Sequence, residues 1–182
     1  MIQRGTKRSY TFGRMIKDIG ILIQHLSKQI IQKKKTGAIN GRFSEHLMLA
    51  VTAVNDCKYC SFIHSRLALQ EGCSQVEVND ILNSNFQNVD KDEITALSFA
   101  QYYADTNGHP DRKSAKALLK CYGATTTEEI LTRIYIIMIG NLAGNTIDAF
   151  EDYIKGYSKR IDSLLLGFII YLIGKPITTF IR

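Results

Sequence analysis

Apolar residues recur at intervals of three and four along most of this chain, which is the spacing of helices that bury one face. The clearest run spans residues 10–34, where the apolar positions include Phe12, Ile16, Ile19 and Ile23. The alternation of apolar and polar residues that is typical of strands does not recur along the sequence. The pattern therefore predicts an all-α fold.

Turn and capping residues divide the chain into further helices. Residues 74–77 and 126–129 have the Ser/Thr-x-x-Glu spacing of a capping box. We expect Asn55 and Asp56 to cap a helix that starts at Cys57 and ends at Gly72. The other expected features are a helix over 43–54, a loop at 37–41, helix starts at 90–93, Pro110 and Asp162, a helix end at 121–123 and a break at Gly144.

The C-terminal end holds the most apolar segment of the sequence. Residues 164–173 read LLLGFIIYLI, and a lysine and a proline at 175–176 are expected to stop this helix. A helix that crosses a bilayer needs about 20 apolar residues, so this segment is too short to span one. Two alternatives remain open. We favour burial at a subunit interface, and the rival is a helix lying on an anionic membrane surface beside the three bases of 155–160.

Composition narrows the class of protein. The chain has 182 residues, of which 45% are hydrophobic and 22% are charged, so it fits one globular domain and not a disordered chain. Four cysteines in this length do not make the framework of a small secreted protein. A close cysteine pair in such a chain is expected to be redox-active or metal-binding.

The net charge of +6 is concentrated at the N-terminus. Residues 1–40 hold nine bases and a single acid, Asp18. The base clusters at 4–8 and 33–35 contain no interleaved aromatic residues, and no nucleic-acid motif accompanies them. We interpret these bases as a solvated helix face and expect no nucleic-acid partner. No signal peptide is recognisable, so a cytoplasmic location is expected, with membrane association as the alternative.

A cysteine pair at helical spacing is the most informative feature of the sequence. Cys57 and Cys60 are three residues apart and His64 follows four residues later, so their side chains share one helix face. Unpaired N–H groups at a helix start stabilise a thiolate, which makes a CxxC pair reactive there. A nearby histidine can take the proton of such a thiol, and a carboxylate can orient the histidine.

Three interpretations of this pair stay open on spacing alone. Spacing favours a redox dithiol, in which one thiol is the nucleophile and the other resolves its oxidised form. A zinc site is the second, and it needs Cys73, His46 or Glu45 to complete a set of four ligands. In the third, the two cysteines are simply small buried side chains.

The pattern Glu-x₁₁-Cys-x₂-Cys-x₃-His, formed by Glu45, Cys57, Cys60 and His64, resembles the AhpD-like/carboxymuconolactone decarboxylase superfamily. Weaker similarities follow in His64, Ala68 and Gly72, in the ALSFA sequence of 96–100, and in Asn141-x₃-Asn145 after a long apolar stretch. The resemblance covers residues 40–157. It leaves a basic helical extension at 1–39 and an apolar segment at 158–182 outside the expected domain.

The resemblance implies a helical, oligomeric thiol peroxidase or disulfide reductase without an organic or metal cofactor. Carried over by position, Cys60 is the peroxidatic thiol and Cys57 is the resolving thiol. His64 and Glu45 form the relay that removes the proton. The implied partners are a hydroperoxide, a dithiol reductant of protein or lipoyl type, and further copies of the chain, with peripheral membrane contact through 158–182 as an added alternative.

One residue departs from the family pattern. Tyr59 lies between the cysteines where the founding alkylhydroperoxidase has a histidine, which leaves the reductant open. The decarboxylases of the superfamily generally lack the CxxC pair, so its presence argues against lactone decarboxylation. The rival functions are a redox or zinc-binding regulator and a membrane-surface interaction protein on the same scaffold.

The remaining chemical residues receive structural interpretations. Without the motif, Glu45 would be read as a surface carboxylate paired with Arg42 or Lys58. We assign no function to His25, His46 or His109. Five residues are expected in the core: Cys73, Cys121, Tyr102, Tyr103 and Met138. Asn141 and Asn145 are expected to have a structural role, as caps or in hydrogen bonds across helices.

Overall fold

The computed structural model describes residues 8–31, 38–157 and 164–179, and this part of the chain contains helices and no strand. The predicted all-α fold is confirmed. The helices are α1 (Phe12–Ile31), α2 (Gly41–Asn55), α3 (Lys58–Gln70), α4 (Gln75–Leu82), α5 (Ile94–Asp105), α6 (Arg112–Ile154) and α7 (Leu164–Thr179). The expected helix start at Asp162 lies outside the described residues.

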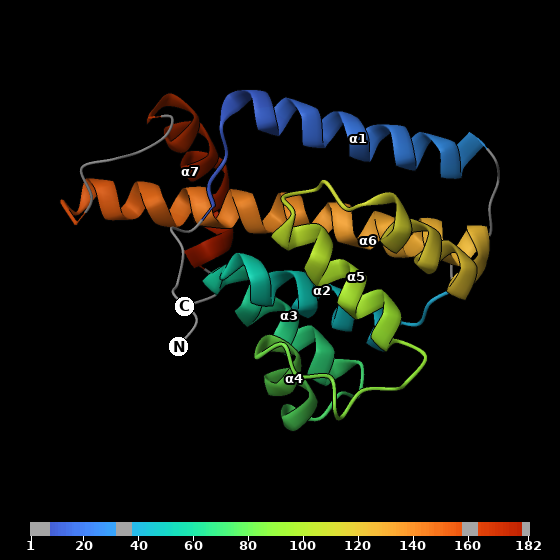
Figure 1. The fold of residues 1–182 in the computed structure, drawn as a ribbon. Helices are drawn as coiled ribbons and strands as arrows, with labels where there is room; N and C mark the ends of the chain where they lie inside the picture. Colours follow the sequence, from blue (N-terminus) through green and yellow to red (C-terminus); the bar gives the residue numbers. More distant parts are fainter. Residues whose placement is uncertain (1–7, 32–37, 158–163, 180–182) are drawn as a thin grey trace.

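The long helix α6 is the centre of the fold (Figure 1). Helix α1 packs along one side of it, α2, α3 and α5 pack against the other, and α7 crosses it. Helix α4 is the farthest from α6 and packs against α2 and α3. The core therefore lies between α6 and α2, whose side chains Leu47, Leu49 and Val51 are fully buried.

Helix α6 changes direction at Gly123, whose φ of 70° favours glycine. The expected helix end at 121–123 corresponds to this turn. Helical structure resumes without the capping box expected at 126–129, because the Glu129 carboxylate accepts hydrogen bonds from the backbone N–H groups of Ala38 and Ile39 at 2.9 and 3.3 Å. The break expected at Gly144 was wrong, since α6 is continuous there.

The stop expected at 175–176 was also wrong, because α7 continues through Pro176 to Thr179. Proline removes one backbone hydrogen bond from this helix. Lys175 Nζ lies 2.7 Å from Glu151 Oε1 of α6 and ties α7 to the central helix. At the start of α6, Asp111 is the cap and accepts from Ser114 N, so Pro110 lies before the helix and not at its first position.

Two residues expected in the core lie at the surface. Cys121 is exposed, since it lies in the solvent-facing turn before Gly123. The side chain of Tyr102 is 36% exposed because its hydroxyl donates to Asp111 at the start of α6. Tyr103, Met138 and Cys73 are buried as expected.

Helix α6 is long and apolar enough to cross a membrane by length and composition. However, 61% of its most apolar window is buried inside the protein. Core helices of soluble proteins pass the same test, so α6 gives no positive sign of a membrane span. Its burial against five neighbouring helices accounts for its apolar character.

Candidate functional site

The cysteine pair lies where α2 ends and α3 begins. Asp56 has a left-handed backbone with φ of 52°, and its N–H donates to Thr52 O, so it ends α2. Cys57 is itself the cap of α3, because its sulfur accepts a hydrogen bond from Cys60 N at 3.3 Å. The cap expected at 55–56 was therefore misplaced by one residue. The Cys57 sulfur nevertheless lies at the N-terminal end of the helix, among its unpaired N–H groups.

The two sulfurs of the pair are in contact. Cys57 Sγ and Cys60 Sγ are 2.7 Å apart and are not joined by a disulfide, whose S–S bond is about 2.05 Å long. Both residues are buried. A small movement of the sulfurs is sufficient to form the bond.

Helix α6 passes so close to the pair that it needs a glycine there. A Cβ atom on Gly144 would lie 2.6 Å from Cys57 Sγ and 3.7 Å from Cys60 Sγ. One turn earlier, a Cβ atom on Gly140 would lie 3.9 Å from Cys60 Sγ, which is ordinary contact. Gly144 therefore allows the backbone of α6 to form the floor beneath both sulfurs.

A histidine–carboxylate pair accompanies the cysteines. His64 Nδ1 of α3 lies 2.7 Å from Glu45 Oε2 of α2, and both side chains are mostly buried. The alternative of Glu45 as a surface partner of Arg42 or Lys58 is not what the structure has. Arg42 pairs with Glu77 and Asp90, and Lys58 pairs with Asp148.

The environment of Cys60 favours its protonated form. The hydrogen bond with Cys57 and then burial raise the pKa of Cys60 well above that of an ordinary thiol. A helix start is expected to lower the pKa of a cysteine. At Cys60 this effect is outweighed by the hydrogen bond with Cys57 and by burial. A base is needed to remove this proton. His64, which bonds with Glu45, lines the same cavity as Cys60.

An apolar cavity of about 460 Å³ opens beside Cys60 and His64. Its walls come from α1, α3, α6 and α7 and from Tyr10, which precedes α1. Among the described residues, no lysine, arginine, aspartate or glutamate lines this cavity. A separate groove over the outer side of α3 is bordered by Cys57, Lys58 and Arg66. The site therefore has an apolar entrance to Cys60 and a more polar groove beside Cys57.

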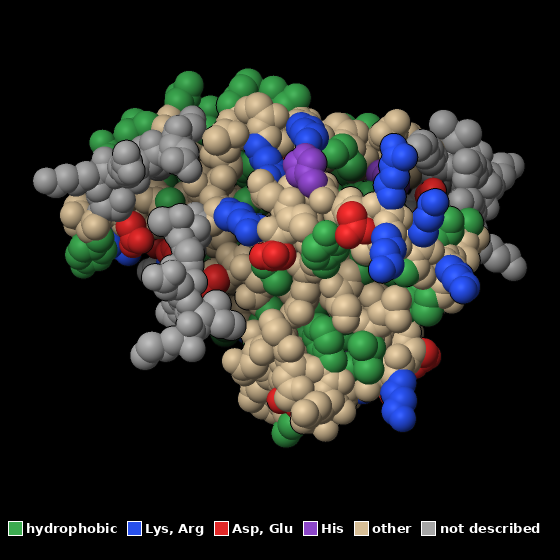
Figure 2. All heavy atoms as spheres, viewed as in Figure 1, with side chains coloured by type: hydrophobic (Ala, Val, Ile, Leu, Met, Phe, Trp, Pro, Cys, Tyr) green, Lys and Arg blue, Asp and Glu red, His purple; other side chains and the backbone are tan. Residues whose placement is uncertain are grey.

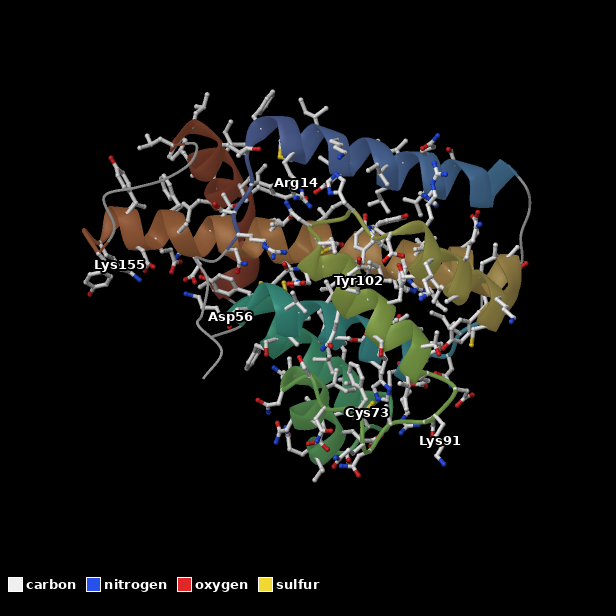
Figure 3. The ribbon with its side chains drawn as sticks, in the orientation of Figure 1. Arg14, Asp56, Cys73, Lys91, Tyr102 and Lys155 are labelled. Atoms are coloured by element: carbon white, nitrogen blue, oxygen red, sulfur yellow. The ribbon has the colours of Figure 1, made fainter. Side chains whose placement is uncertain are left out.

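A second cysteine–histidine–glutamate chain was missed in the sequence. His46 Nδ1 lies 2.6 Å from Glu93 Oε2, and His46 Nε2 lies 3.2 Å from Cys73 Sγ. All three residues are buried, and Cys73 lies in the lower part of the view, near α4, away from Asp56 at the cysteine pair (Figure 3). No local spacing joins residues 46, 73 and 93, so only the tertiary fold brings them together.

The two asparagines expected to bond between helices do so. Asn141 Oδ1 accepts from Thr52 Oγ1 at 3.1 Å, and Asn145 Nδ2 donates to the carbonyl of Asn55 at 2.8 Å. Both bonds join α6 to the end of α2, directly before the cysteine pair. Their expected structural role is confirmed. The two bonds hold the backbone at the end of α2, directly before Cys57.

Within the described residues, no group of three or more His, Cys, Asp or Glu side chains is arranged to hold a metal ion. The residues considered as zinc ligands from the sequence contact one another or other side chains instead. His64 Nδ1 is directed at Glu45, and the sulfurs of Cys57 and Cys60 contact each other. The candidate fourth ligands Cys73 and His46 are joined in the separate chain.

Comparison with models of known protein families gives a match for part of the chain. Residues 21–102 match the model of the Carboxymuconolactone decarboxylase family. This segment belongs to that family. The match begins within α1 and ends within α5, and it contains the cysteine pair, His64 and Glu45. The resemblance inferred from the motif is thereby confirmed. Searches of curated proteins and of solved structures found no match.

Proposed function

We propose that this protein is a thiol-dependent peroxidase that reduces hydroperoxides with the Cys57–Cys60 dithiol. The observation that carries the proposal is the 2.7 Å contact between the two sulfurs at the end of a cavity that His64 also lines. The contact supports rapid disulfide formation, and the cavity gives a small molecule access to Cys60. The family supports an enzyme of this broad class.

The proposed reaction has three steps. His64, oriented by Glu45, accepts the proton of Cys60, and the thiolate attacks the terminal oxygen of the hydroperoxide. The O–O bond breaks, the alcohol leaves with the proton, and Cys60 becomes a sulfenic acid. The Cys57 thiol then forms the disulfide with Cys60 and releases water. A dithiol donor reduces this disulfide and is itself oxidised to a disulfide.

The cavity argues against the reaction in the family's name. A carboxylated lactone carries negative charge, and burial of an unpaired carboxylate is strongly unfavourable. In the part of the chain that the structure describes, no lysine or arginine lines the cavity to compensate such a charge. The apolar lining therefore favours a neutral hydroperoxide as substrate over a carboxylated lactone.

Thiol-trapping mass spectrometry tests the proposal. Reduced, metal-stripped protein is mixed with one equivalent of cumene hydroperoxide, beside the variants Cys57→Ser, Cys60→Ser and, as a control, Cys121→Ser. We expect a Cys57–Cys60 disulfide in the parent and in the control, and a sulfenic acid at Cys60 in Cys57→Ser. Thiols that stay reduced in all four proteins would refute the peroxidase. Zinc retained until a chelator is added would favour the regulator instead.

We also propose that the protein works in a reducing compartment such as the cytoplasm and as a homo-oligomer. The exposed apolar residues of α7, Leu164, Leu165, Phe168, Ile169, Leu172 and Ile173, support a contact beyond the single chain. Sedimentation velocity decides between the two interpretations of this face. Oligomers in dilute buffer favour the subunit interface, and a monomer that co-sediments with anionic vesicles favours the membrane surface.

A further inference from the structure

The cavity beside Cys60 owes its apolar character to helices outside the matched family segment. Of the described residues of the segment 21–102, only Tyr59, Cys60, Ile63 and His64 line the cavity. The other lining residues come from the start of α1, from α6 and from α7, and most of them are isoleucine. The matched segment thus supplies the reactive groups. The parts of α1, α6 and α7 that lie outside the segment determine which molecule reaches these groups.

The open side of the cavity is apolar as well. Ile173 of α7 is 70% exposed and Ile19 of α1 is 40% exposed, and both line the cavity. Figure 2 shows hydrophobic side chains gathered along the edge of the molecule where α7 and the start of α1 lie. Cys60, in contrast, is only 7% exposed. The cavity therefore runs from a buried sulfur to an apolar mouth.

These observations define the chemistry of a ligand. The volume of about 460 Å³ lies within the range of about 300–1,000 Å³ that small-molecule sites occupy. A peroxide without an alkyl group would leave the isoleucine walls unused, whereas a hydrocarbon chain would bury its surface against them. Each methylene that leaves water for such a site is expected to tighten binding by up to about fourfold.

We propose that the cavity binds the hydrocarbon chain of a lipid-type alkyl hydroperoxide, with the peroxide at Cys60 and the chain extending toward Ile173. The inference rests on the proposed peroxidase for its reaction, in which the O–O bond is cleaved by Cys60 and the long-chain alcohol is released. Recognition of the hydrocarbon chain needs no charged side chain of the protein. Ile19, Ile147 and Ile173 are then specificity-determining residues.

The test uses one series of substrates and one series of unreactive analogues. The rate of Cys57–Cys60 disulfide formation is measured with hydrogen peroxide and with linear alkyl hydroperoxides from butyl to decyl. In parallel, linear alcohols of the same lengths are tested for protection of Cys60 against iodoacetamide. The second measurement reports on the cavity whether or not the protein reduces peroxides.

Two variants of α7 form a matched pair. Ile173→Asp places a charge at the mouth of the cavity, and Leu165→Asp places the same charge at a residue that is 71% exposed but does not line the cavity. Both positions are exposed on the single chain and belong to the same apolar face of α7, so neither change is expected to unfold the protein and an effect on assembly would be common to both. We expect Ile173→Asp to abolish the dependence on chain length and Leu165→Asp to preserve it.

The outcomes separate the two proposals. Rates and protection that rise two- to fourfold per methylene support the alkyl-chain site, and loss of this rise in Ile173→Asp alone locates it. Disulfide formation that is independent of chain length, with no protection by alcohols, overturns the inference and leaves the peroxidase intact. Protection that rises with length in a protein that never oxidises supports the site and refutes the peroxidase.

Discussion

The closeness of α6 to the cysteine pair predicts that Gly144→Ala impairs disulfide formation. The added Cβ would lie 2.6 Å from Cys57 Sγ, whereas ordinary contact begins at 3.4 Å, so one of the two groups must move by about 1 Å. A misplacement of about 1 Å at a reacting group can slow a reaction about 100-fold. We therefore expect the disulfide to form 10- to 100-fold more slowly, by order of magnitude.

The effect on stability has two opposing parts. Overpacking of a core costs about 1–3 kcal/mol, while replacing glycine by alanine inside a helix gains about 1 kcal/mol. The expected net change is a loss of up to about 2 kcal/mol in the free energy of unfolding of the reduced protein. Urea denaturation under reducing conditions measures this change, and thiol trapping after rapid mixing with hydroperoxide measures the rate.

Gly140→Ala is the matched control. It lies one turn earlier on the same helix, and its Cβ would lie 3.9 Å from Cys60 Sγ and 4.0 Å from Ile137 Cδ1, where it fits. We expect this variant to gain up to about 1 kcal/mol of stability and to form the disulfide faster than Gly144→Ala, although its added methyl group lies in the cavity wall. If Gly144→Ala is as stable and as fast as Gly140→Ala, the sulfurs do not pack on α6 as described and the reasoning fails.

Three further predictions concern the two thiol chains. Glu45→Gln should slow the oxidation of Cys60 by about 100-fold at neutral pH, with binding of an alkyl alcohol unchanged; an equal loss of alcohol binding would indicate misfolding instead. The bond with Cys57 is the largest cause of the raised pKa of Cys60, so Cys57→Ala should lower that pKa and move the alkylation rate profile to lower pH; an unmoved profile would contradict this assignment. Glu93→Gln removes the charged partner of buried His46 and should cost about 1.5–3 kcal/mol in urea denaturation, without changing the rate of disulfide formation.

The sequence predicted those parts of the site that depend on local spacing. Ser74 and Glu77 form the capping box as expected, because both partners lie within one helical turn. Cys57, Cys60 and His64 share α3 for the same reason. Glu45 could be connected with His64 only through the family resemblance, since the two residues lie on different helices.

The errors arise where tertiary contacts replaced a local signal. Gly144 was taken as a helix break because glycine is a weak helix former, but its small size is required by a sulfur from another helix. Glu129 matched a capping box, yet its carboxylate binds the backbone N–H groups of residues 38 and 39. Propensity and spacing contain no information about such partners.

Helix α2 shows why residue type alone does not identify a reactive thiol. Glu45 and His46 are adjacent in sequence, and neighbouring helical residues point in different directions. Glu45 therefore bonds with His64, whereas His46 bonds with Glu93 and Cys73. His64 and Cys60 line the apolar cavity. Cys73 lines neither that cavity nor the groove over α3, and burial raises its pKa.

Access is therefore the property that distinguishes the two thiols. A hydroperoxide can reach Cys60 through the cavity, while Cys73 is 5% exposed beneath the ion pair of Arg42 and Glu77, whose charges act on its sulfur. If access is decisive, low concentrations of hydroperoxide should oxidise Cys60 and leave Cys73 reduced in the same sample, which peptide mapping after thiol trapping would measure. Oxidation of Cys73 at an equal rate would show that the cavity does not control reactivity.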